Sequence, residues 1–370
     1  MSFGRLLAVV VIWVLWGASA HAQILVGQTV GVTGAVAATV KESMTGASLY
    51  IDAINGKGGV GGEKIEILTL DDKFDTKLTA VNARKLIEDR QVVALFMTRG
   101  TPNTEGIIPL LDQYGVPLIG PSTGAMIFHQ PVRRHVFNVR ATYQREAEKA
   151  IVYLASLGMT RIAVIHVDDG FGTDGLQGAQ NGLAAAKLKA VTIVKFDRSK
   201  PDFSKIAPLM AQSNAQAIMI IGSGTAVVDG IKAMKAAGSR AQFVTLSNNA
   251  SAGFVKLLGE QARGVIVTQV FPYERSIVYP LIKEAIELAK AKGLDGVSPA
   301  MIEGFASAKV LVEALRRASP KPSRERIQSA LESMHQYDIG GLEINYSPTN
   351  HTGLDFADLS IIDADGKFRR

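Results

Sequence analysis

Cysteine is absent from the 370-residue chain, and histidine is scarce, with six residues. A chain without cysteine can form neither a disulfide nor a thiolate metal site, and it cannot carry a lipid on an N-terminal cysteine, so its stability must come from its core alone. The histidines beyond residue 22 lack metal-ligand spacing, and no phosphate loop of the G-x-x-x-x-G-K-[ST] type occurs. We therefore expect no metal and no other cofactor.

Long blocks of one charge are also missing. The formal net charge is +6, but the 40 basic and 34 acidic residues are interspersed along the chain. A nucleic-acid-binding surface needs clustered Lys and Arg, so we expect no nucleic-acid partner.

A long apolar run occurs only at the N-terminus. It extends from Leu6 to Trp16, follows Arg5, and precedes the tripeptide Ala20-His21-Ala22. The run is shorter than the about 20 residues that cross a membrane, and this order of segments is typical of a secretory signal peptide. The sequence predicts that residues 1–22 are removed after Ala22 and that a soluble product reaches the periplasm. An uncleaved anchor is the alternative.

Beyond residue 22, short apolar segments alternate with amphipathic helical patterns. This alternation predicts an α/β fold with parallel sheets that helices cover on both faces. It restarts near residue 160, so we expect two doubly wound lobes with a cleft between them. Strands are expected at 24–30, 64–70, 92–97, 116–119, 161–167, 190–196, 216–221, 242–246, 264–270 and 359–362, and helices at 43–55, 76–89, 104–114, 143–157, 174–187, 203–213, 226–237, 252–258, 276–292, 300–317 and 323–334.

A glycine-rich stretch at 55–62 matches G-x-G-x-x-G through Gly56, Gly58 and Gly61. A dinucleotide-binding fingerprint needs a strand before these glycines and a helix after them, because the pyrophosphate lies on the helix N-terminus. Here a helical pattern precedes the glycines and a β-rich pattern follows them. The stretch therefore predicts a helix-to-strand turn.

Polar turns follow five of the predicted strands. Ligands of open α/β sheets bind outside the carboxyl ends of the strands, and hydroxyls with free N–H groups at helix starts suit a carboxylate or another small anion. The alternative is that Thr101, Thr104, Ser122 and Ser247 only cap helices. The turns are 98–104, 120–124, 168–172, 222–225 and 247–249.

The turn at 120–124 also matches G-x-S-x-G, the nucleophile elbow of α/β-hydrolases. A serine hydrolase that uses Ser122 is thus an alternative function, with His351 and Asp338 as candidate partners. The match is weak, because a hydrolase elbow opens into a long helix, whereas His129-Gln130-Pro131 stops this segment early.

Several segments, taken in order and spacing, resemble one family. They are Thr45-Gly46-Ala47, the run 55–62, Asp71-Asp72 with Asp75, and the segments 82–87, 115–122, 136–140, 161–166 and 171–175. Over nearly all of the chain after residue 22, the sequence resembles the periplasmic solute-binding proteins of ABC transporters, specifically the type I group around the leucine/isoleucine/valine-binding protein.

The resemblance implies two lobes joined by a three-segment hinge, with crossings near Ala141, Phe271 and Tyr346. Lobe 1 would comprise 24–141 plus 272–346, and lobe 2 would comprise 142–271 plus 347–370. The lobes would close on the ligand by hinge bending. The implied role is a binding protein without enzymatic activity, which delivers its solute to an ABC permease. A sensor subunit of the same fold is the alternative, and we expect a monomer.

The resemblance also assigns ligand contacts. Thr101 would place its hydroxyl on the ligand carboxylate, and Ser122, Thr123 and Gly124 would form a second contact turn, in which Gly124 offers only its main chain. Phe171 would cover the ligand from lobe 2. Ser223 lies where other members place an aromatic residue, which would leave a roomier pocket.

The turn Ser247-Asn248-Asn249 departs from the family, because amino-acid-binding members carry a carboxylate there for the ligand ammonium. A buried ammonium without a charged partner is costly. Either Asp168, Asp169 or Glu105 takes this role, or the ligand is an aromatic or aliphatic acid without an α-ammonium. Arg99 would then add positive charge, with Ser247 and Asn248 as further contacts. Both ligand classes remain open.

Overall fold

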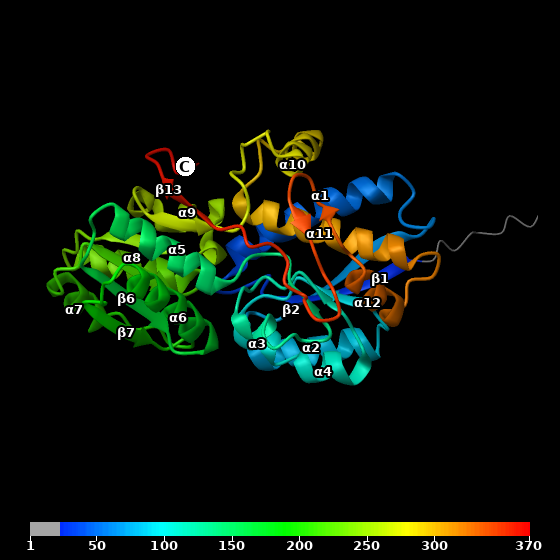
Figure 1. Ribbon diagram of the computed structural model, residues 1–370, viewed down its shortest axis with the longest axis horizontal. Helices are drawn as coiled ribbons and strands as arrows, with labels where there is room; N and C mark the ends of the chain where they lie inside the picture. Colours follow the sequence, from blue (N-terminus) through cyan, green and yellow to red (C-terminus); the bar gives the residue numbers. More distant parts are fainter. Residues whose placement is uncertain (1–22) are drawn as a thin grey trace, which may run out of the picture.

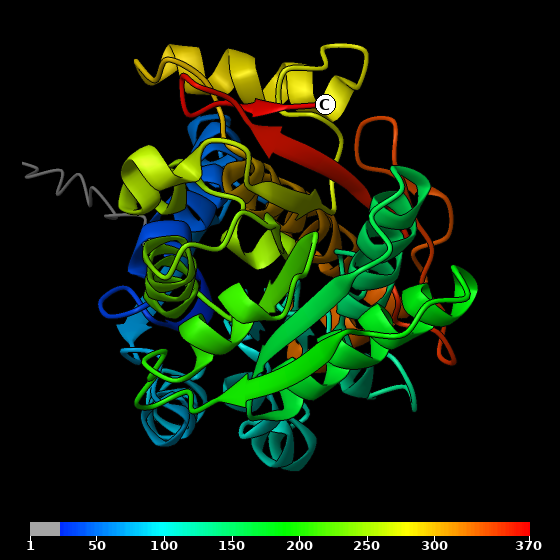
Figure 2. The ribbon, with the colours of Figure 1, turned by 90° about the vertical axis from the view of Figure 1, so that its left-hand side faces the viewer.

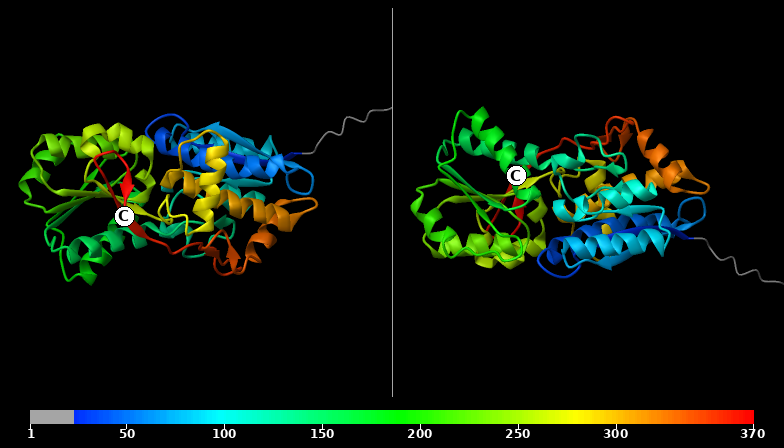
Figure 3. Two further views of the ribbon diagram at one scale, coloured as in Figure 1. Left: turned by 90° about the horizontal axis from the view of Figure 1, so that it is seen from above. Right: turned by 90° about the horizontal axis from the view of Figure 1, so that it is seen from below.

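The computed structural model describes residues 23–370, so the predicted signal peptide at 1–22 lies outside the described residues. These residues form two α/β lobes that follow one another along the long axis of the molecule (Figure 1). We call lobe 1 the part built on a five-stranded sheet, and lobe 2 the part built on a seven-stranded sheet. The views from above and below (Figure 3) show the same division, with the C-terminus on lobe 2.

Lobe 1 has the strand order β2-β1-β3-β4-β5, and all its pairings are parallel. Its strands are β1 (Gln23–Val30), β2 (Lys64–Asp71), β3 (Ala94–Phe96), β4 (Leu118–Ile119) and β5 (Val136–Phe137). Its helices are α1 (Ala37–Gly56), α2 (Thr76–Glu88), α3 (Thr101–Glu105), α4 (Ile108–Tyr114) and the 3₁₀ turn η1 (Met126–Phe128), joined by α10 (Pro280–Ala291), α11 (Pro299–Ala318) and α12 (Arg324–Glu332) from later in the chain. A small hairpin of β11 (Tyr337–Asp338) and β12 (Glu343–Ile344) follows α12.

Lobe 2 has the strand order β14-β13-β10-β9-β8-β6-β7. Its strands are β6 (Ile162–Val167), β7 (Thr192–Phe196), β8 (Ala217–Ile221), β9 (Gln242–Thr245), β10 (Ile266–Gln269), β13 (Asp358–Ile362) and β14 (Phe368–Arg369). Its helices are α5 (Tyr143–Ser156), α6 (Gly170–Ala185), α7 (Ile206–Gln212), α8 (Thr225–Ala236) and α9 (Ala252–Leu258), with the 3₁₀ turns η2 (Ser247–Asn249) and η3 (Gly259–Ala262). The central strands β6 and β8 are buried along their whole length, which explains their unbroken apolar sequences.

The predicted fold class, two α/β lobes with parallel sheets, is confirmed except at one edge of lobe 2. There β13 pairs antiparallel with β10, and β14 pairs antiparallel with β13. Figure 2 shows β13 in red at this edge of the sheet. The chain returns here from lobe 1 without a crossover helix, so nothing forces the new strand to run parallel. None of the helices in residues 23–370 combines the length and apolar character that a membrane crossing needs.

Three sequence-based element predictions need correction. Helix α1 begins at Ala37 and not at 43, and α6 begins at Gly170 and not at 174. The single helix expected at 104–114 is two helices, because Pro109 starts α4 as a new helix after α3 has ended. The turn at 55–62 is confirmed as a helix-to-strand turn, since α1 ends at Gly56 and β2 starts at Lys64.

The closest helix contact in lobe 1 joins α1 to α11, which lie side by side in Figure 1. Glycine makes the contact possible at two points. A Cβ atom added to Gly46 would lie 1.9 Å from Met301 O, and one added to Gly304 would lie 1.9 Å from Ser43 O. The two backbones therefore touch directly, and no larger residue fits at either position.

This packing predicts that Gly304→Ala destabilises the protein by about 1–3 kcal/mol or more, because neither backbone can retreat from a contact within a packed core. Gly56→Ala is the matched control. A Cβ at Gly56, at the end of α1, meets nothing within 4 Å, so its effect should be neutral or slightly stabilising. Urea unfolding of the mature chain measures both, and equal midpoints for the two variants would contradict the packing argument.

Candidate ligand-binding site between the lobes

The lobe 1 side of the site consists of the turns after β3 and β4. Ser122 N donates to Thr98 O at 2.7 Å, and an isolated parallel bridge joins Arg99 to Ser122, so the two turns continue the sheet beyond its strands. The predicted contact residues Thr101 and Thr123 are buried, and their hydroxyls lie 2.8 Å apart. The fold therefore brings these hydroxyls together, as their positions at strand ends predict.

The lobe 2 side consists of the turns after β8 and β9. Asn248 Nδ2 donates to Gly222 O and to Ser223 Oγ, both at 3.0 Å. Asn249 Oδ1 accepts a hydrogen bond from Gly224 N at 2.9 Å. The amides at 248 and 249 therefore fix the shape of the neighbouring turn.

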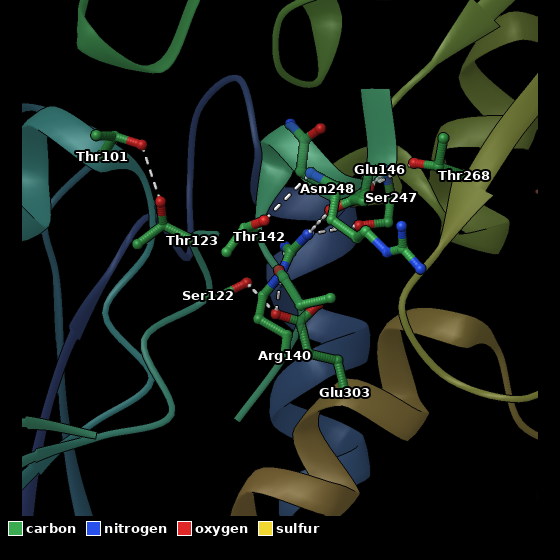
Figure 4. A network of polar contacts seen from close by, with 12 residues as sticks. Thr101, Ser122, Thr123, Arg140, Thr142, Glu146, Ser247, Asn248, Thr268 and Glu303 are labelled. Carbon is green, nitrogen blue, oxygen red and sulfur yellow. Dashed lines mark hydrogen bonds and ion pairs between the residues drawn. The ribbon is translucent and has the colours of Figure 1, made fainter. Parts of the chain in front are cut away.

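Four buried charges join the two sides. Arg140 forms an ion pair with Glu146 on α5, and its Nη1 lies 3.8 Å from Glu303 Oε1 on α11. Arg99 Nη1 donates to Ser122 Oγ at 3.0 Å, and Ser122 Oγ donates to Glu303 Oε1 at 2.8 Å. Figure 4 shows Arg140, Glu146, Glu303 and their serine and threonine partners converging at this point. The two arginines and two glutamates balance in charge, which buried ions require.

The network also crosses the lobe boundary by hydrogen bonds. Arg99 Nη2 donates to Asn248 O at 2.5 Å, and Arg140 Nη2 donates to Ser247 Oγ at 2.7 Å. Glu146 accepts from Ser247 N at 2.9 Å and from the hydroxyl of Thr268. The predicted residues Ser247 and Asn248 thus lie at the boundary, bonded to residues of the network.

The two arginines differ in their surroundings. Burial alone would lower the pKa of Arg140, but the charge of Glu146, with Tyr143 and Glu303, outweighs burial and holds that pKa above its ordinary value. Burial lowers the pKa of Arg99, and Tyr143 and Glu303 offset this only in part. Within the described chain, no carboxylate lies at ion-pair distance from Arg99, which donates only to neutral oxygens. Arg99 is therefore the cation of the network best placed to gain from an added anion.

Aromatic rings extend the site in lobe 2. Phe171 is buried, and its ring centroid lies 4.7 Å from that of Tyr143. The guanidinium of Arg140 lies over the other ring of this pair, 4.6 Å from the Tyr143 centroid. Phe171 thus packs against Tyr143 at the start of α6, and its contact with a ligand stays a prediction.

Gly124 has a structural role that the sequence does not indicate. Its carbonyl accepts a hydrogen bond from Tyr143 N at 2.8 Å, and a Cβ added to it would lie 2.6 Å from Ala141 O. The missing side chain is therefore explained by the close approach of the linker between the lobes.

The three acids considered as partners of a ligand ammonium lie outside the charge network, and two of them are paired with basic side chains. Asp168 pairs with Lys195 at 2.8 Å in an exposed position. Asp169 caps α6 through Gly172 N and pairs with Arg198. Glu105 is exposed and lies near Arg133, away from the network. Within residues 23–370, no three His, Cys, Asp or Glu residues converge in a way that could hold a metal ion.

Two alternative interpretations of the turns are wrong. Neither α3 nor η2 has a side-chain cap, so Thr101 and Ser247 do not serve as N-caps, and the caps lie at other residues, such as Ser251. Ser122 is not a hydrolase nucleophile, because its hydroxyl lies between Arg99 and Glu303 with no histidine beside it. The short 3₁₀ turn η1, and not a long helix, follows the elbow-like motif.

The sequence-based prediction missed Arg140, Glu146, Glu303 and Tyr143. Two weak signals were available. Glu303 is an isolated acid within the otherwise apolar first turns of α11, and Arg140 directly follows the mostly apolar segment 136–139, in which Asn138 is the polar residue. A charged residue within an apolar segment must be paired if it is buried. The sequence could have shown that partners exist, but not which residues they are.

Two lobes with facing strand ends and a buried polar boundary define a two-lobed solute-binding protein. The family model described as "Periplasmic binding protein" matches residues 23–366, and the chain belongs to this family. Its similarity to the leucine/isoleucine/valine-binding group is confirmed, and the family consists of substrate-binding proteins of transporters and not of enzymes.

Individual relatives agree with this assignment. The chain is 24% identical to the Leu/Ile/Val-binding protein of Escherichia coli K12 over 266 residues, which cover 71% of each chain. It is 25% identical to Leu/Ile/Val-binding protein homolog 3 of Brucella melitensis over 347 residues, 90% of each chain. A substrate-binding periplasmic protein from Ralstonia solanacearum superposes with a TM-score of 0.86 at 30% identity, over 94% of this chain and 99% of the other.

A second set of contacts holds the lobes together at the side of α1. The carboxylate of Glu42 accepts hydrogen bonds from Ala252 N at 3.0 Å and Gly253 N at 2.6 Å, at the start of α9. Next to it, the hydroxyls of Thr39 and Ser251 lie 2.9 Å apart. These bonds join α1 of lobe 1 to the start of α9 in lobe 2.

We expect Glu42→Gln to shift the ligand-free protein toward an open form, because an amide cannot accept both N–H groups as a carboxylate does. Bonds to a charged group contribute about 1.5–3 kcal/mol, so the closed-to-open ratio should fall at least about 10-fold. Small-angle X-ray scattering should then give a larger radius of gyration. Glu325→Gln, the same change at an exposed position of α12, should leave the scattering unchanged. If the radius of gyration of Glu42→Gln equals that of the wild type, the Glu42 contact does not hold the lobes together.

Asp174 predicts a pH dependence. Burial raises its pKa to about 6, although hydrogen bonds from Gln144 and Met126 N act in the opposite direction. A carboxyl whose pKa is raised by folding stabilises the fold when protonated, and this contribution is lost as pH rises through about 6. Asp174→Asn stays neutral at every pH. Relative to the wild type it should therefore gain about 1–3 kcal/mol of stability between pH 4 and pH 7.

Urea unfolding across this pH range measures the difference. Asp112→Asn at an exposed position is the control and should follow the wild type at every pH. If the unfolding free energies of Asp174→Asn and the wild type changed in parallel with pH, folding would not raise the pKa of the Asp174 carboxyl.

Proposed function

We propose that the protein is the extracytoplasmic binding component of an ABC importer, and that it binds a small carboxylate-bearing solute between the lobes. The observation that carries the proposal is the buried guanidinium of Arg99 at the meeting of both sheets' strand ends. It is 3% exposed, it bonds only to neutral oxygens, and it contacts both lobes. An anion beside it would give this guanidinium a charged partner of its own at a point that is buried from water.

The proposed contacts follow from the same geometry. The hydroxyls of Thr101, Ser122 and Thr123 would orient the carboxylate from lobe 1, together with the main-chain N–H of Gly124. Phe171, Ser223, Ser247 and Asn248 would complete the site from lobe 2. These residues lie on the two facing edges described above, which supports a shared role.

We infer that the ligand is a carboxylate without an α-ammonium. The acids at the boundary are already engaged: Glu146 with Arg140, Glu303 with Ser122, and Asp169 with Arg198. An ammonium buried here would have to displace one of these bonds or remain without a charged partner, and either is costly. Relatives named for leucine, isoleucine and valine binding share the lobes, but position 247–249 lacks an acid.

The remaining assignments belong to the same proposal. Residues 1–22 act as a signal peptide that is cleaved after Ala22, and the mature protein works in the periplasm as a monomer that engages a membrane permease. The hinge crossings lie near Ala141, Phe271 and Tyr346. This placement is supported by the sheets, because the chain changes lobe between β5 and β6, after β10, and again before β13.

A thermal-shift panel tests the ligand class. We expect small aromatic or aliphatic carboxylates to raise the melting temperature and their amides, which match them in shape but lack the charge, to have no effect. A ligand at 100 times its Kd adds about 2.7 kcal/mol of stability. Zwitterionic amino acids should raise the melting temperature much less. If only amino acids stabilise the protein, the hypothesis that its ligand lacks an α-ammonium is wrong.

The role of Arg99 is tested in the same panel. Arg99→Gln should abolish the difference between each carboxylate and its amide, and Arg99→Lys should restore part of it, because the charge returns without the planar guanidinium. Lys195→Gln, which removes an exposed cation of lobe 2, should keep the wild-type preference.

A further inference from the structure

A second pocket lies between the lobes, beside the predicted contact turn 222–225. Its volume is about 230 Å³. Ala35 and Phe74 line it from lobe 1, and Val167, Phe196 and Arg198 are among the residues that line it from lobe 2. Ser223, which belongs to the proposed ligand contacts, is also part of its wall. The pocket therefore shares this residue with the proposed site.

Phe74 is held in this pocket by an unusual backbone. Its φ angle is +63°, and that of Lys73 is +53°, a left-handed conformation that bulky residues rarely adopt. The buried carboxylate of Asp72 maintains it by accepting a hydrogen bond from Phe74 N at 2.9 Å. Strained backbone that the surroundings maintain is concentrated at binding sites.

The ring of Phe74 connects the pocket to the lobe 1 turn. A Cβ added to Gly100 would lie 2.7 Å from a ring atom of Phe74, so this ring packs directly on the backbone next to Arg99 and Thr101. On the opposite side, a Cβ on Gly222 would lie 2.9 Å from the ring of Phe196. Two aromatic rings thus rest on the glycines of the two facing turns.

Arg198 closes the pocket across the lobe boundary. Its Nε pairs with Asp169 at 2.5 Å, and its guanidinium lies 4.7 Å from the centroid of the Phe74 ring. Its Nη1 is buried and makes no hydrogen bond to the described residues. A donor left in this way costs free energy unless a partner is supplied.

We infer that this pocket is a second subsite, which takes a planar aromatic ring of the ligand. The inference rests on the proposed carboxylate function and narrows it to arene carboxylates. The ring lies against Phe74 and Phe196, and the guanidinium of Arg198 contacts its face. Aromatic pairs and cation–π contacts both favour a π system over a saturated group of equal size.

The volume agrees with one ring. A cavity of about 150 Å³ holds benzene, so about 230 Å³ accommodates a ring with a small substituent. A branched aliphatic side chain would fill less of this space and would leave the aromatic faces without a partner.

Isothermal titration with benzoate and cyclohexanecarboxylate tests the subsite, because the two acids match in size and charge and differ in planarity. We expect the wild type to bind benzoate about 5–30-fold more tightly. Phe74→Leu and Arg198→Gln should each bring the ratio close to one. Phe74→Tyr, which keeps the ring, and Lys200→Gln, which removes an exposed cation nearby, should retain the preference. Melting temperatures of the free variants confirm that each is folded.

The outcomes separate the two proposals. Equal binding of the two acids by the wild type, or an unchanged ratio in both Phe74→Leu and Arg198→Gln, overturns the aromatic subsite while carboxylate binding stands. If no carboxylate binds, and Arg99→Gln therefore changes nothing, the proposed function fails and the subsite fails with it.

Discussion

The charge network of Arg99, Arg140, Glu146 and Glu303 is the constraint on which the closed structure depends. Its members come from the β3–α3 turn, the linker after β5, α5 and α11, and they meet only when both lobes are in place. A buried charge that loses its partner costs several kcal/mol, whereas the assembled set is balanced. The network therefore penalises any arrangement of the lobes in which only part of it is formed.

Small residues make the boundary close enough for these bonds. A Cβ on Gly224 would lie 1.9 Å from Ala35 O, and one on Gly253 would lie 2.8 Å from Ala38 Cβ. Thr225 N donates to Ala35 O at 3.1 Å across the same boundary. The lobes thus touch through backbone, and their alignment is set by shape and by a few polar bonds. Contacts of this kind can be made and broken as units, which suits hinge closure.

The sequence predicts the framework better than the site. Unbroken apolar segments such as 162–167 and 217–221 identify buried parallel strands. The ends of the predicted strands 92–97, 116–119 and 242–246 locate Thr101, Ser122 and Asn248 at the boundary. The antiparallel edge strand β13 has no such signal, because its direction depends on where the chain returns. The early start of α6 was missed because Gly170 and Gly172 weaken the helical pattern, although Asp169 caps that helix.

The residues missed by sequence analysis share a physical cause. Arg140 and Glu146 are six positions apart, but Glu303 joins them from far along the chain, and pairing at that range is decided by tertiary packing. The same holds for Arg198 and Phe74, whose contact crosses the lobes. An individual charged or aromatic residue in a sequence indicates that it needs a partner. Only the fold identifies the residue that is this partner.

The charge balance also bears on selectivity. The network is neutral before any ligand enters, and the arginine without a carboxylate at ion-pair distance is Arg99. A simple carboxylate adds the one charge that Arg99 can use. A zwitterion adds an ammonium as well, which must lie within a few ångströms of its own carboxylate and hence near Arg99, while Glu146 and Glu303 stay bonded to other groups. Repulsion between like charges at low dielectric then offsets the gain from the carboxylate. Under the proposed function, the boundary would therefore select ligands by charge before it selects them by shape, and the aromatic pocket would act on the ligands that remain.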